Sequence, residues 1–223
     1  MSIKDACTVL SPKAFAKIGE QYGDNLNILV AEAYRPGTEL YKISRPHSFD
    51  AGLILFPKEG FDIKYLFTVL SCDVAVSMLL LGENSKVKKI TVKALSNMKI
   101  AKLDTKQQTA IGFLGDMNQD LMKFIFTGDL RPYLDFQQKQ ISELIDSIYL
   151  ETLLPSILKE YKIDILNNWV QMYEEVAEIK KSSTAEQSYR AIFESFLNPS
   201  NPVINNMKKL RVVLDIILRQ MPK

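Results

Sequence analysis

The residues able to support acid–base or metal-dependent chemistry are few and far apart. The single histidine, His47, stands in a proline-containing loop without a serine or cysteine nucleophile motif around it. Asp164 with Glu178 and Lys180 has the composition of a metal-dependent nuclease motif. Both acids fall on one predicted helix, however, and a rise of about 1.5 Å per residue places them about 20 Å apart. Because that spacing rules out a shared metal ion, and no glycine-rich phosphate loop occurs, we predict no catalytic residue, no metal site and no cofactor.

Cationic side chains are concentrated in one segment, residues 82–93, and these could contact phosphate groups. The lysines are Lys86, Lys88, Lys89 and Lys93. Phosphate contacts position a protein on DNA and do not read its sequence. The nearby side chains able to address base edges are those of Asn84 and Ser85. A loop of solvated lysines would have the same sequence, so both interpretations stay open.

The elements around these lysines follow from the hydrophobic pattern. Ile90, Val92 and Ala94 alternate with polar residues, which predicts a strand, and a short polar turn then leads to a second strand ending at Ile100. Asp104 is a good helix N-cap, and Gln107 three residues later can complete a capping box. We therefore expect strands before residue 103 and a long helix after it.

The predicted long helix has an apolar repeat typical of a helical association surface. Its three- and four-residue spacing is carried by Ile111, Leu114, Asn118, Leu121 and Ile125. A polar residue at one such position can fix the register of a coiled coil, and Asn118 is suited to that role. Packing of the same side chains inside the monomer, against residues 134–148, is the alternative.

Two phrases in this half of the chain resemble the specificity (S) subunits of type I restriction-modification enzymes. Residues 61–71 are similar to a Tyr-Leu-Phe helix behind the recognition face of that family. Residues 90–111 are similar to the end of its target recognition domain: Ile90, Leu95 and Ile100 match an apolar run, Leu103-Asp104-Thr105 a short turn, and Gln108-x-x-Ile111 the opening of a spacer helix. The resemblance covers roughly residues 50–125.

The resemblance implies a non-catalytic protein that recognises DNA and docks a methyltransferase or nuclease subunit through its helices. It also implies a loop at residues 82–89 close to the recognition face. The recognition-like part, residues 1–103, is short for the family, and a homodimer would restore the usual two-fold layout. The alternative is a protein–protein interaction or regulatory module that keeps the fold without binding DNA.

The composition is ordinary for a globular protein, and the predicted strands followed by helices place the chain in the α+β class. The 223 residues are 47% hydrophobic and 24% charged, and the two cysteines, Cys7 and Cys72, are too few for a disulfide scaffold. A small mixed domain, residues 1–103, is expected to precede an all-helical coiled-coil or bundle region, residues 104–223. No run of about 18 apolar residues and no signal-peptide layout occurs, so we expect a cytoplasmic protein without a membrane span.

Overall fold

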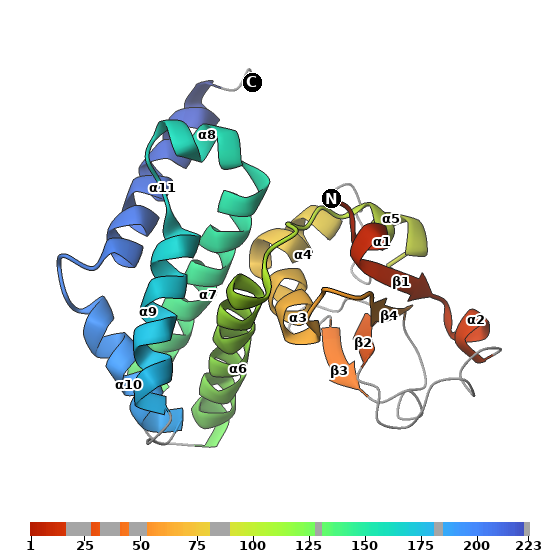
Figure 1. Ribbon diagram of the computed structural model, residues 1–223, viewed down its shortest axis with the longest axis horizontal. Coiled ribbons are helices and arrows are strands. Elements are labelled where there is room, and N and C mark those ends of the chain that lie inside the picture. The colour runs from red at the N-terminus through yellow and green to blue at the C-terminus, as the bar shows by residue number, and fades with distance from the viewer. Residues whose placement is uncertain are drawn as a thin grey trace. The chain divides into compact units, whose positions relative to one another are not determined.

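The chain forms two compact units, Met1–Asp116 and Met117–Lys223, in a computed structural model (Figure 1). The helix α6 (Thr105–Thr127) contributes residues to both units. The structure describes residues 1–16, 28–31, 41–44, 53–80, 90–127, 131–180 and 185–220.

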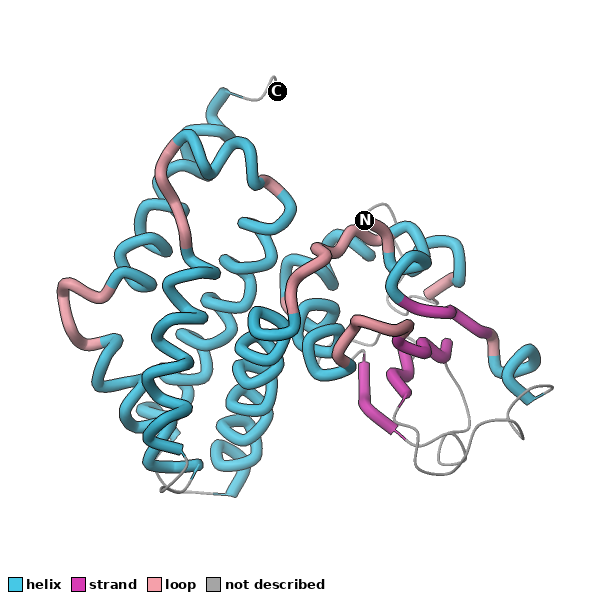
Figure 2. The backbone as a smooth tube through the Cα atoms, viewed as in Figure 1, coloured by secondary structure: helices cyan, strands magenta, loops and turns pink. Residues whose placement is uncertain are grey.

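The first unit contains a four-stranded antiparallel sheet with the order β1-β4-β2-β3. Its strands, the magenta segments of Figure 2, are β1 (Cys7–Leu10), β2 (Ile28–Ala31), β3 (Tyr41–Ser44) and β4 (Leu53–Pro57). The apolar run of β4 predicts a buried strand, and Ile54, Leu55 and Phe56 are buried. The ring of Phe56 stacks on that of Phe15 at 5.7 Å between centroids.

Five helices of the first unit precede α6 within the described residues. They are α1 (Ile3–Ala6), α2 (Pro12–Ala16), α3 (Ile63–Ser71), α4 (Asp73–Leu80) and α5 (Val92–Asn97). Asp62 begins α3 as its N-cap, where its carboxylate accepts a hydrogen bond from the Tyr65 N–H at 2.9 Å. Residues 65–70 of α3 are all buried, so this helix is the centre of the core on its side of the sheet.

The strand predicted at residues 90–94 is wrong, because these residues enter the helix α5. The Thr91 hydroxyl caps α5 by accepting the Ala94 N–H at 3.1 Å. Alternation would require Val92 and Ala94 to be buried, yet both are exposed, and Leu95 is the buried residue of the helix. The second predicted strand is an isolated bridge in which Lys99 pairs with Ser2.

The described part of the second unit contains helices and no strand. After α6 it contains α7 (Arg131–Leu153), α8 (Pro155–Glu160), α9 (Ile165–Lys180), α10 (Ala185–Phe196) and α11 (Pro202–Gln220). In Figure 1, α7, α9 and α11 run side by side. The side chain of Trp169 in α9 is completely buried. Residues 161–164 separate α8 from α9, and Lys162 among them has a φ of +53°.

The α+β class predicted from the sequence is confirmed. The predicted helix start at Asp104 is confirmed as well, because α6 begins at Thr105. No helix among the described residues is long and apolar enough to cross a membrane.

Candidate functional site

The side chain of Gln108 joins two segments of the first unit, the turn before α3 and the start of α6. It is buried, with 2% of its surface exposed. Its Oε1 accepts the Asp62 N–H at 2.7 Å, and its Nε2 donates to the carbonyls of Gly60 and Leu103 at 2.8 and 2.9 Å. All three partners are backbone groups that would be costly to bury unpaired, so the glutamine fixes the start of α3 against the start of α6.

One further hydrogen bond joins the same segments, and a capping box fixes the start of α6. The Tyr65 hydroxyl of α3 donates to the Ala101 carbonyl at 2.8 Å. At the start of α6 the Asp104 carboxylate accepts the Gln107 N–H at 2.8 Å, and the Gln107 side chain accepts the Asp104 N–H at 3.2 Å. The predicted capping box is therefore present, and it sets the position at which Gln108 enters the core.

Two glycines let α6 approach α3 closely. A Cβ at Gly115 would overlap the Thr68 hydroxyl and lie 3.1 Å from the Thr68 Cβ, and a Cβ at Gly112 would lie 3.0 Å from the Lys64 Cβ. Glycine costs about 1 kcal/mol in a helix interior relative to alanine, so these positions indicate that close packing offsets a local penalty. Lys64 also forms an ion pair with Asp116 at 2.6 Å along this contact.

Of the side chains predicted to contact DNA, only that of Lys93 lies within the described residues. Lys93 is exposed on α5, not on the strand that the alternation predicted. The lysines Lys86, Lys88 and Lys89, together with Asn84 and Ser85, lie outside the described residues, as does His47. Lys99 and Lys102, which follow α5, are exposed as well.

The apolar side chains predicted to form an association surface are buried within the single chain. Ile111, Leu114 and Leu121 have at most 3% of their surface exposed. Ile125 belongs to α6, but its side chain lies outside the described part. The alternative interpretation expected burial inside the chain against residues 134–148, and packing against those residues stays a prediction.

Asn118, the polar member of that repeat, bonds to α7. Its Oδ1 accepts from the Gln138 Nε2 at 3.2 Å, and the Ser142 hydroxyl lies 3.4 Å from the same atom. Gln138 also donates to Ser142 at 2.9 Å. The amide thus helps to fix the register of α6 against α7 within one chain.

Burial raises the pKa of two titratable groups, the buried Cys7 and the half-buried Glu151. Burial raises the pKa of the Cys7 thiol to about 12, so this cysteine is not a nucleophile at neutral pH. Burial also raises the pKa of the Glu151 carboxyl to about 7, although its Oε2 accepts the N–H groups of Ile165 and Leu166, each at 2.9 Å. Asp164 accepts the Asn167 N–H at the start of α9, and Glu178 lies near the other end of that helix.

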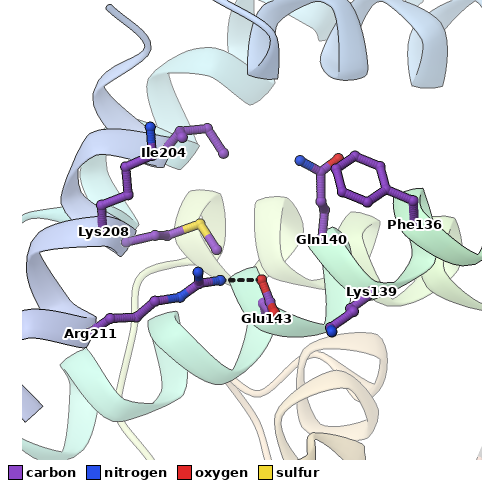
Figure 3. Close-up of a pocket in the computed structure, with 8 residues that line it drawn as sticks. Phe136, Lys139, Gln140, Glu143, Ile204, Lys208 and Arg211 are labelled. Atoms are coloured by element: carbon purple, nitrogen blue, oxygen red, sulfur yellow. Dashed lines mark hydrogen bonds and ion pairs between the residues drawn. The ribbon is translucent and has the colours of Figure 1, made fainter. Parts of the chain in front are cut away.

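The second unit contains a pocket that the sequence did not predict (Figure 3). It has a volume of about 310 Å³ and lies between α7 and α11. The lining side chains are Phe136, Lys139, Gln140, Glu143, Ile204, Met207, Lys208 and Arg211. Lys208 and Arg211 line the pocket from α11, and Lys209 between them in the sequence does not. The pairing of α7 with α11, which forms the pocket, could not be predicted from the sequence.

A scan against protein-family models found no match to this chain, and searches of curated proteins and of solved structures found none either.

Proposed function

We propose that this chain is a non-catalytic, specificity-subunit-like protein of a restriction-modification or related defence system in the cytoplasm. In this proposal the first unit contacts DNA, and helices of the second unit dock a methyltransferase or nuclease subunit. A second copy of the chain would complete the two-fold arrangement that one recognition-like unit lacks.

One observation supports this proposal above the others: the two phrases that resemble the S subunits are packed against each other. The first phrase supplies Asp62 and Tyr65 of the start of α3, and the second supplies Ala101 and Gln108. Gln108 is the glutamine of the Gln-x-x-Ile opening, and its three hydrogen bonds explain why a glutamine stands at this position. The glutamine is needed because it must accept from one backbone group while donating to two others.

Binding to duplex DNA tests the proposal. We expect fluorescence anisotropy with labelled DNA of random sequence to show an affinity that falls between about 50 and 200 mM salt, with a slope of log K against log salt of about −3 to −4 if four lysines contact phosphate. Replacing Lys86, Lys88, Lys89 and Lys93 with Ala should remove most of that slope. A control with Lys159→Ala and Lys209→Ala removes exposed cations from the second unit and should leave the slope unchanged.

The second candidate function is an interaction or regulatory module without DNA binding. The pocket between α7 and α11 favours it, because this hollow belongs to the all-helical unit and needs no nucleic acid. The same DNA measurements, repeated with a methyltransferase subunit of a type I restriction-modification enzyme added, separate the two functions. Absence of salt-dependent affinity in both experiments would refute DNA recognition and leave the interaction module.

The proposal also predicts that the pure protein has no nuclease, methyltransferase or hydrolase activity. DNA cleavage that requires a divalent cation, and that disappears on changing one carboxylate of this chain, would refute the non-catalytic assignment.

A further inference from the structure

The pocket between α7 and α11 leaves apolar surface uncovered. Its floor includes Met207, which is 5% exposed, and the half-buried Ile204. On the opposite wall the ring of Phe136 is 55% exposed. An exposed aromatic ring beside an apolar hollow is typical of a binding site, because folding alone would favour its burial.

The walls of the pocket carry positive charge. Lys139 stands on α7 and Lys208 on α11, and both are exposed. Arg211 forms an ion pair with Glu143 across the gap between the two helices, as the dashed line in Figure 3 shows. Three cations and one carboxylate give the lining a net charge of +2, and the two lysines are the charges that a ligand can still pair with.

The shape and the surroundings favour an extended partner over a small molecule. A volume of about 310 Å³ is at the small end of ligand pockets and suits one large apolar side chain. Tyr133, one turn before Phe136 on α7, is 60% exposed and extends the aromatic surface beyond the pocket. An amphipathic helix can bind in a hydrophobic groove of this kind by inserting one or two apolar side chains.

We propose that the groove between α7 and α11 docks an acidic amphipathic helix of a partner protein. One aromatic or long aliphatic side chain of that helix fills the pocket between Phe136 and Met207. Its carboxylates pair with Lys139 and Lys208, which selects acidic partners and speeds association. This inference does not depend on DNA recognition by the first unit, so failure of the DNA experiments leaves it standing.

Selection from a displayed library of random peptides, each about four helical turns long, tests the proposal with the full chain as target. We expect the selected peptides to combine an aromatic or aliphatic anchor with Asp or Glu about one turn away on either side. Synthetic copies of these peptides then serve in titrations against variants. Lys208→Glu reverses a pocket charge, and Lys209→Glu reverses the neighbouring exposed charge that does not line the pocket, so the pair is a matched control.

Lys208→Glu should weaken binding of the selected peptides by about tenfold or more, whereas Lys209→Glu should change it by less than about threefold. Phe136→Ala removes an exposed ring and should also weaken binding about tenfold, with the fluorescence of the buried Trp169 showing that the unit stays folded. Three results would overturn the proposal. The selected peptides could lack an acidic bias, or the two lysine variants could have equal effects on binding. The third is that phenylacetate, a small aromatic carboxylate, displaces the peptide completely when the two are present at equal concentration.

Discussion

Gly115→Ala should destabilise the first unit even though alanine is the better helix former. Helix propensity alone favours alanine by about 1 kcal/mol. The new Cβ would overlap the hydroxyl of Thr68, which is 3% exposed and donates to the Lys64 carbonyl at 2.7 Å. Forcing an atom into a packed contact costs about 1–3 kcal/mol. Loss of the hydroxyl bond adds about 1 kcal/mol. We therefore expect a net loss of about 1–3 kcal/mol.

The assay must follow the first unit, and Trp169, the only tryptophan, lies in the second. Amide hydrogen exchange of α3 and of the first half of α6 reports the first unit directly. Thr68→Ala removes the overlapping hydroxyl, so the double variant should recover at least about 1 kcal/mol of the loss as a coupling energy. Thr109→Ala, at an exposed position of α6, controls for propensity and should not destabilise by more than about 0.5 kcal/mol. If these amides are as well protected from exchange in the Gly115→Ala variant as in the wild type, the close approach of α6 to α3 is refuted.

Four further predictions follow from single residues. Gln108→Leu leaves two carbonyls and one N–H without their partner and should lower the free energy of unfolding by about 3 kcal/mol or more. Gln107→Ala removes one capping contact and should lower it by about 1 kcal/mol in the same exchange assay. Because the pKa of Glu151 is raised to about 7 in the folded state, from an ordinary value of 4.5, its contribution to stability is complete below pH 4.5 and is lost as the pH rises to 7. Urea unfolding followed by Trp169 should show this loss in the wild type, and Glu151→Gln should flatten it; equal slopes for both would contradict the assignment. Asn201→Ala removes an acceptor of the Ile204 N–H and a donor to the Ser195 carbonyl and should lower the urea midpoint by an amount equivalent to about 1–3 kcal/mol. The Cys7 thiol, 1% exposed, should react with a thiol reagent only when the protein unfolds. Rapid labelling of Cys7 in the native protein would contradict its burial.

The parts of the fold that the sequence predicted correctly are those fixed by neighbours in the chain. Asp104 and Gln107 stand three residues apart, so their capping box could be read directly, and β4 is an unbroken apolar run. The strand predicted at residues 90–94 failed because alternation over five residues is a weak signal. The Thr91 hydroxyl caps a helix and so favours helix over strand at these residues. A strand also needs a neighbouring strand to pair with in the sheet.

The candidate site depends on partners distant in the sequence. Gln108 bonds to groups 46 and 48 residues away, and no local pattern shows which backbone groups its side chain reaches. The apolar repeat of α6 indicates a buried helix face, but it does not say whether the same chain or a second copy covers that face. The pocket requires α7 beside α11, a pairing that amphipathic periodicity alone leaves undetermined.

The attachment of the first residues to the segment near residue 100 sets an order for folding on the ribosome. The Ile3 N–H donates to the Met98 carbonyl at 2.8 Å, and the Ile100 N–H donates to the Met1 carbonyl at 3.0 Å. Translation at about 5–20 residues per second separates the synthesis of these partners by about 5–20 seconds. The side chain of Ile3, which is buried in the folded protein, therefore lacks part of its native contacts while the strands of the sheet are synthesised. Nascent chains stalled before residue 98 should consequently lack a closed first unit, and chaperones that bind apolar N-terminal segments have that interval in which to act.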